Sequence, residues 1–186
     1  MNVTKILAWT LLPIVIGTSS TNLIAEPSKQ TNQDTQDYNC KLILGGVERF
    51  LLPKLDTQIT ARVDTGATLS SISAYNVQIY EQNNVVHASF DMATDNGLTS
   101  VKIPVQKFIQ IKQQAEPKPA TRPVILLEIK LGSITGEFEF SLSDRSHLSS
   151  KALIGRNILR QQGVVDVSQQ FLQSGENDGQ KLCDDE

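Results

Sequence analysis

Apolar and polar residues alternate along most of the chain between residues 41 and 167, with the period of two that is typical of half-buried β-strands. In the clearest run, residues 58–63, the apolar positions are Ile59, Ala61 and Val63. Further strands are expected at residues 41–44, 47–52, 69–74, 85–90, 98–103, 105–111, 124–131, 134–142, 152–154 and 164–167. Residues 156–162 favour a helix that ends at Gly163. The pattern therefore predicts a mainly β domain, a small barrel or sandwich, with one short helix near the C-terminus.

Short runs rich in glycine, asparagine and proline separate these strands and predict how they connect. Gly45-Gly46 and Gly132-Ser133 each suit a tight hairpin turn between the strands that flank them. Asp95-Asn96-Gly97 is another strong turn signal, and we expect a mobile hairpin tip there. Residues 113–122 contain prolines and predict a surface loop.

The first 25 residues have the layout of a secretory signal peptide. Lys5 precedes an apolar run from Ile6 to Gly17, and small polar residues then lead to a cleavage site after Ala25. The run is short for a membrane span, which makes an uncleaved N-terminal anchor the less favoured alternative. We therefore expect export, with the mature protein periplasmic or secreted.

Composition divides the remaining chain into three parts. Residues 26–39 are polar without apolar periodicity and predict a disordered leader, residues 40–173 form the folded domain, and residues 174–186 are a polar tail. The formal net charge of −3 argues against nucleic acid or anionic lipid as the main partner.

The only cysteines, Cys40 and Cys183, lie at the two ends of the expected folded domain. In an exported protein such a pair predicts a disulfide, either within the chain or between the chains of a dimer. The alternative is two free thiols in the terminal segments.

Motifs for metal, nucleotide and serine chemistry are absent from the sequence. His87 and His147 are the only histidines, and no His-Glu-x-x-His or Cys-x-x-Cys pair is available to hold zinc. The sequence also lacks the glycine-rich phosphate-binding motifs and the Gly-x-Ser-x-Gly of serine hydrolases. We therefore expect no metal site and no cofactor.

Carboxylates remain as the candidate chemistry, and Asp64 differs from the others in its setting. It follows the apolar strand at residues 58–63 directly, and Thr65, Gly66 and Ala67 come after it. Thr65 offers a hydroxyl, and Gly66 lets a second backbone approach closely. An aspartate in this setting either caps a turn or acts as an acid–base group, and the motif alone leaves both interpretations open.

A second motif, Leu153-Ile154-Gly155-Arg156-Asn157, lies about 90 residues downstream, where an apolar strand runs through glycine into the expected helix. Together with Asp64-Thr65-Gly66-Ala67, it resembles the retropepsin-like aspartic peptidases, and the resemblance covers roughly residues 41–170. Arg122-Pro123-Val124 and Leu142-Ser143-Asp144-Arg145 resemble, more narrowly, the bacterial branch often labelled ATP-dependent zinc protease. The residues support neither the ATP nor the zinc of that label.

The resemblance implies a small closed acid-protease barrel with one short C-terminal helix, and it assigns roles to residues. Asp64, Thr65 and Gly66 would be catalytic, Ala67 would bind substrate together with Asn96 and Gly97 at the tip of a flap, and Leu153, Ile154, Gly155, Arg156 and Asn157 would support the Asp64 loop. In that family an acidic residue commonly follows Asp-Thr-Gly-Ala and pairs with the arginine. This chain has Thr68 instead, which leaves Asp166 and Asp144 as candidate partners of Arg156.

The resemblance also implies a homodimer. Aspartic peptidase chemistry needs two carboxylates that share one proton, and the chain carries a single Asp-Thr-Gly. A working site would join one Asp64 from each chain at a two-fold axis and would hydrolyse a peptide or protein substrate. The alternative is a catalytically silent protein of the same fold that holds a peptide or an envelope or membrane-protein partner.

Overall fold

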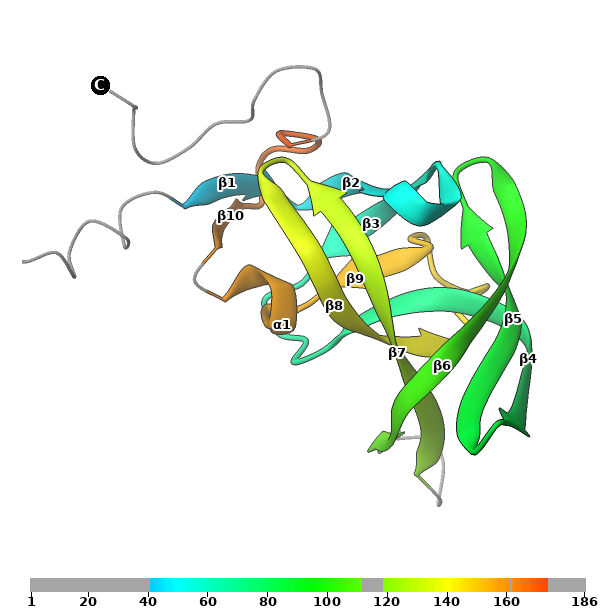
Figure 1. The fold of residues 1–186 in the computed structure, drawn as a ribbon. Helices are drawn as coiled ribbons and strands as arrows, with labels where there is room; N and C mark the ends of the chain where they lie inside the picture. The colour runs from blue at the N-terminus through cyan, green and yellow to red at the C-terminus, as the bar shows by residue number, and fades with distance from the viewer. Residues whose placement is uncertain (1–40, 112–118, 161, 174–186) are drawn as a thin grey trace, which may run out of the picture. The chain divides into compact units, whose positions relative to one another are not determined.

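The computed structural model describes residues 41–111, 119–160 and 162–173, and in these ranges the chain is almost entirely β-strand (Figure 1). The elements are β1 (Leu42–Gly45), β2 (Val47–Leu52), the 3-10 helix η2 (Pro53–Leu55), β3 (Thr57–Val63), β4 (Ser70–Gln82), β5 (Val85–Thr94), β6 (Gly97–Ile111), β7 (Ala120–Leu131), β8 (Ile134–Ser143), β9 (Ala152–Ile154), α1 (Arg156–Leu159) and β10 (Gly163–Asp166). The prediction of a mainly β fold with one short helix near the C-terminus is confirmed.

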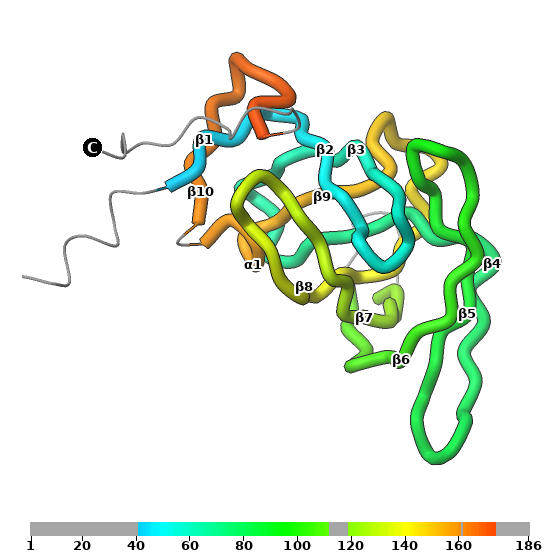
Figure 2. The backbone as a smooth tube through the Cα atoms, turned by 45° about the horizontal axis from the view of Figure 1, so that its top comes forward, coloured from blue at the N-terminus to red at the C-terminus, as the bar shows by residue number. Residues whose placement is uncertain are grey.

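Eight strands form one mixed sheet in the order β2-β3-β9-β4-β5-β6-β7-β8. Additional pairings, β2 with β7 and β4 with β8, curve this sheet back onto itself, and the tube in Figure 2 follows the resulting ring. The rings of Phe50 and Phe140, both fully buried, lie 5.8 Å apart inside it. The sheet is therefore closed around one hydrophobic core, as in a small barrel.

Strand β3 shows how the sequence pattern produces this core. Ile59, Ala61 and Val63 are buried, whereas the alternate side chains at Gln58 and Arg62 are exposed. Successive side chains in a strand point to opposite faces, so alternation places one set in the core. The strand ends at Val63, so the buried side chains of β3 fix the position from which the chain continues into Asp64.

The connection at Gly45-Gly46 is not the predicted hairpin. Strand β1 pairs in parallel with β10 at the C-terminal end of the fold, and β2 pairs with β3. Gly45 is needed for a close approach, because a Cβ there would lie 2.7 Å from the carbonyl oxygen of Gln169. Gly45 therefore lets segment 169–170 pass close to the chain, and the two glycines do not form a turn between paired strands.

Strand β4 is much longer than the predicted strand at residues 69–74. It continues to Gln82 and pairs with β5 through a turn at Asn83-Asn84, whose φ angles are 53° and 60°. Two adjacent residues with positive φ are typical of the type I′ turns that close two-residue hairpins. In both views the β4–β5 hairpin extends away from the ring of strands (Figures 1 and 2).

The predicted helix is shorter than expected. It ends at Leu159, because Arg160 has φ −58° and ψ 129° and leaves the helical conformation. Gly163 does not cap the helix but opens β10, where a Cβ would lie 2.6 Å from Leu44 Cδ1. Pairing with β1 therefore determines that Gly163 begins a strand, and the helical propensity of the residues before it does not extend the helix to this point.

Several sequence predictions fall outside the described residues. These are the signal peptide, the leader at residues 26–39, the polar tail, Cys40, Cys183 and most of the loop at residues 113–122. The described part of that loop region shows β7 beginning at Ala120. Over the described residues, no helix has the length and apolar character needed to cross a membrane.

Candidate active site

Asp64 lies at the end of β3, where neighbouring β9 holds it in place. Its N–H donates to the carbonyl oxygen of Ile154 at 2.9 Å, and its own carbonyl accepts the N–H of Ala67 at 3.3 Å. Carboxylate Oδ1 accepts the N–H of Gly66 at 2.8 Å, whereas Oδ2 has no hydrogen-bond partner within the described residues. The side chain thus caps its own turn with one oxygen, as one of the two sequence interpretations expects, and the residue is half-buried.

The loop that follows Asp64 rests on the start of α1. The N–H of Arg156 donates to Ala67 O at 2.8 Å, and the N–H of Asn157 donates to Thr68 O at 3.2 Å. Gly155 lies so close beneath the loop that a Cβ would be 2.8 Å from the carbonyl carbon of Leu69. A glycine at this position is therefore a packing requirement, since its φ of −101° is open to any residue.

Asn157 ties three elements together below the loop. Its Oδ1 accepts hydrogen bonds from the N–H and the hydroxyl of Ser70, at 2.8 and 2.7 Å. Its Nδ2 donates to Glu139 O at 2.8 Å, which links α1 to β8. Ile154 is fully buried and Leu153 is half-buried at the edge of a cavity. The structure thus brings all five residues of the second motif to the Asp64 loop.

Arg156 holds the loop through two backbone carbonyls and a hydroxyl group; among the described residues it forms no ion pair with a carboxylate. Its guanidinium donates to Thr65 O at 3.1 Å, to Gly66 O at 2.7 Å and to Thr68 Oγ1 at 2.8 Å. The expectation that Asp166 or Asp144 pairs with Arg156 is wrong. Asp166 accepts hydrogen bonds from Ser168, and Asp144 accepts one from Ser146; these bonds lower the pKa of each carboxyl group.

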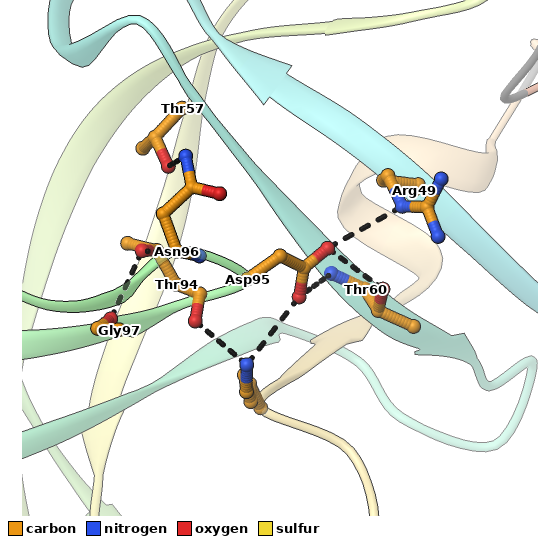
Figure 3. Close-up of polar contacts among 8 residues, drawn as sticks. Arg49, Thr57, Thr60, Thr94, Asp95, Asn96 and Gly97 are labelled. Carbon is orange, nitrogen blue, oxygen red and sulfur yellow. Dashed lines mark hydrogen bonds and ion pairs between the residues drawn. The ribbon is translucent and has the colours of Figure 1, made fainter.

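Asn96 and Gly97 do not lie near Asp64, so the prediction that they form a substrate-binding flap tip is wrong. Asn96 Nδ2 donates to Thr57 Oγ1 at 3.4 Å (Figure 3), and Thr57 begins β3, whereas Asp64 follows its other end. A strand rises by about 3.3 Å per residue, which puts the two sites roughly 20 Å apart along β3. The N–H of Asp95 also donates to Gln58 O at 2.9 Å, so this turn is fastened to the sheet.

Two cavities share part of their lining, and we call them together the groove. One of about 650 Å³ is lined by Ala67, Thr68 and Leu69, and one of about 900 Å³ lies between the base of the β4–β5 hairpin and the start of β7. Arg122 and Arg145 line both cavities. The exposed apolar side chains of Val77 and Ile79 reach the larger one from the hairpin. The hairpin that faces this groove is thus the one with its turn at Asn83-Asn84.

Arg145 is a buried cation at the meeting point of the two cavities. Only 9% of the residue is exposed; its Nη1 donates to Ser71 Oγ at 3.0 Å and its Nε to Ser150 O at 3.1 Å. Burial lowers the pKa of Arg145, nearby Arg122 lowers it further, and the charge of Asp64 raises it. No carboxylate forms an ion pair with Arg145 within the described residues. In the sequence, both arginines belong to segments that carry the family resemblance, but no local pattern around either residue indicates that the two lie close together.

Metal-binding side chains do not gather in the described ranges: no group of three or more His, Cys, Asp or Glu residues lies together there. His87 stacks on Tyr80 with ring centroids 5.6 Å apart, and its Nδ1 lies 2.9 Å from Val85 O.

Comparison with known proteins identifies the family. Residues 43–176 match the model of the RimB-like family, described as the retropepsin-like aspartic endopeptidase RimB. The chain belongs to the RimB-like family of retropepsin-like aspartic endopeptidases. This family match agrees with the resemblance drawn from Asp64-Thr65-Gly66 and Gly155-Arg156-Asn157.

RimB-like sequences also occur within larger relatives. The chain is 28% identical over 142 residues to a probable alpha-L-glutamate ligase of Shewanella halifaxensis, and 28% identical over 134 residues to one of Desulfotalea psychrophila. These matches cover 74% and 70% of this chain but only 31% and 29% of the relatives. The chain therefore spans about a third of the length of the curated relatives that it matches.

A solved structure shares the fold. The crystal structure of a Legionella pneumophila protein of unknown function superposes with a TM-score of 0.61 and 28% sequence identity. The match covers 72% of this chain and 98% of the Legionella protein. The RimB-like domain thus corresponds to nearly the whole of that protein.

Proposed function

We propose that this protein is an exported aspartic endopeptidase whose active site forms when two chains pair and bring their Asp64 side chains together. The observation that carries the proposal is the placement of Asp64, with Oδ1 held by its own turn and Oδ2 without a hydrogen-bond partner among the described residues. Because each chain has one Asp-Thr-Gly, the second carboxylate comes from a second copy.

In such a pair, two close carboxylates share one proton, since repulsion between like charges favours the protonated form of one of them. The ionised carboxylate takes a proton from a bound water, and the protonated carboxyl group donates a hydrogen bond to the scissile carbonyl. The water oxygen then forms a bond to the carbonyl carbon. The C–N bond breaks as the leaving nitrogen takes up a proton from the pair. Thr65 and Gly66 keep the two loops in register and leave room for the substrate backbone.

The groove favours a substrate with acidic side chains. Arg122 and Arg145 meet there, and Arg145 is a buried cation without a carboxylate partner in the described structure. Glu139 also lines the groove, but Lys107 pairs with it at 2.6 Å. A guanidinium group binds a carboxylate through two parallel hydrogen bonds, which gives both strength and orientation. The relatives are named probable alpha-L-glutamate ligases, and glutamate has a side chain that this pair of arginines suits.

The alternative is a catalytically silent protein that uses the same groove to hold an acidic peptide or an envelope partner. Thr68 favours the silent alternative. In the retropepsin-like family an acidic residue is common at this position, where it is available to the arginine that corresponds to Arg156 and to the substrate backbone. The two functions predict different results for the same variant. The peptidase requires Asp64, whereas peptide binding at the arginines does not.

The test compares mature wild-type protein with Asp64→Asn on a library of acidic and neutral peptides between pH 3 and pH 7. The proposal expects cleavage that falls by at least about a thousandfold in the variant, since the dyad supplies both the base and the acid. Sedimentation equilibrium measures whether the active species is a dimer. Equal inertness of both proteins together with tight peptide binding would establish the silent alternative.

A further inference from the structure

Asp95 lies in the turn between β5 and β6 and binds two residues on other strands, Thr60 and Arg49, and a third, Lys151, that directly precedes β9 (Figure 3). Its carboxylate accepts hydrogen bonds from the N–H and hydroxyl of Thr60 at 3.1 and 2.8 Å. It also forms ion pairs with Arg49 at 3.3 Å and with Lys151 at 3.5 Å. We call these contacts the Asp95 clasp. The proposed reaction does not use them directly.

Lys151 connects the clasp to the segment that lines the groove. Its Nζ donates to Thr94 O at 2.6 Å in addition to the ion pair with Asp95, and its own carbonyl accepts the N–H of Ser73 at 2.7 Å. Residue 151 directly precedes β9, whose end is bonded to Asp64. The backbone at this point is therefore held by β4 on one side and by the clasp on the other.

The neighbouring carbonyl orients Arg145. Ser150 O accepts a hydrogen bond from Arg145 Nε at 3.1 Å, and Ser71 Oγ accepts one from Nη1 at 3.0 Å. A continuous series of contacts thus runs from Asp95 through Lys151 and the Ser150 carbonyl to the guanidinium in the groove. Asp95 and Lys151 are 56 positions apart in the sequence (151 − 95), and only the closed sheet brings them together.

We propose that Asp95 is a positioning residue for acidic substrates, because it fixes the backbone that aims Arg145 into the groove. The inference rests on the proposed function, from which it takes the acidic substrate. Without the carboxylate, Lys151 keeps its bond to Thr94 O but loses its charged partner, and Arg49 loses the same partner. The backbone of residues 144–151 is then held less firmly, and the guanidinium of Arg145 is less well oriented for hydrogen bonds to a substrate carboxylate.

The experiment measures binding of a glutamate-rich peptide and of its glutamine counterpart, in an Asp64→Asn background so that no peptide is cut. Asp95→Asn is expected to weaken binding of the glutamate peptide by about five- to tenfold and to leave the glutamine peptide unchanged. Asp95→Glu restores part of the loss. Asp56→Asn is the matched control, since Asp56 lines the same surface pocket as Asp95 and forms no ion pair with any described residue. It removes the same charge and leaves both affinities unchanged.

A double-mutant cycle with Arg145→Lys separates positioning from a general loss of stability. If Asp95 acts through Arg145, the double variant binds the glutamate peptide about as weakly as Arg145→Lys alone. Additive losses, or equal losses for both peptides, overturn the inference. Wild-type protein that binds no glutamate peptide also overturns it. Cleavage of neutral peptides by that same protein would leave the proposed peptidase function standing.

Discussion

The carboxylate of Glu48 on β2 and the backbone N–H of Leu172, which are 124 positions apart, form a hydrogen bond of 2.9 Å inside the protein. The same fully buried carboxylate accepts the N–H of Gly45 at 2.7 Å and the N–H of Gln173 at 3.1 Å. Segment 172–173 is thereby fastened beside β1 and β2. A buried charge is tolerated here because three backbone donors replace the water that it loses.

Glu48→Gln should lower the free energy of unfolding by about 3 kcal/mol, because an amide is a weaker acceptor and its NH2 group faces backbone donors. Urea unfolding, followed by far-ultraviolet circular dichroism, measures this change. Glu81→Gln, at an exposed position on β4, is the control and should change stability by less than about 0.5 kcal/mol. Equal midpoints for the two variants would contradict the role given to Glu48.

Gly155→Ala should displace the Asp64 loop. The added Cβ would lie 2.8 Å from Leu69 C and 3.0 Å from Ala67 O, and both are backbone atoms that move only with the loop. We expect a loss of about 1–3 kcal/mol in stability, and a loss of peptidase activity that exceeds the fraction of protein unfolded. Thermal unfolding and kcat measure the two effects.

The matched control for that substitution is Gly46→Ala, whose Cβ would make only ordinary contacts, the nearest at 3.6 Å. It should leave activity unchanged. If the two alanine variants have the same stability and activity, the close contact between Gly155 and the Asp64 loop does not require glycine.

Thr68→Asp should strengthen the hold of Arg156 on the loop. Arg156 Nη2 already lies 2.8 Å from Thr68 Oγ1, so a carboxylate at this position would add an ion pair. The site is exposed, and the expected gain in the free energy of unfolding is therefore below about 1 kcal/mol. Differential scanning calorimetry at low salt, with neutral Thr68→Asn for comparison, measures it. A rise in melting temperature that high salt does not reduce would contradict the ion pair.

Asp91 should make stability fall in acid. Hydrogen bonds from Asn76 and then from Ser100 lower the pKa of its carboxyl group below the ordinary value of 3.8. A carboxyl group with a lowered folded-state pKa contributes stability above its unfolded pKa and loses that contribution as pH falls through the folded value. The loss therefore begins near pH 4 and grows below it.

Asp91→Asn tests this by removing the titrating group at the base of the β4–β5 hairpin. The variant should be less stable than wild type at neutral pH, and the difference should shrink below about pH 4. Urea midpoints between pH 2 and pH 7 measure the difference. A gap of constant size across that range would show that Asp91 does not titrate in this way.

Local pattern and short motifs determined much of this fold and part of its site. Alternation over residues 58–63 placed β3, and Asp64 at its end, because a strand with one buried face has a single favourable register. The two motifs around Asp64 and Gly155 correctly indicated that their residues meet. Each of these features is encoded within a few neighbouring residues.

Tertiary structure decided the rest, because it depends on contacts between residues far apart in the chain. Asp95-Asn96-Gly97 and Asn83-Asn84 are both good turn sequences, but only packing against Thr57 and Thr60 fastens the first and leaves the second to extend beside the groove. The pairing of β1 with β10 likewise goes with the close approach of the chain at Gly45. Arg122 and Arg145 meet only because the sheet closes on itself.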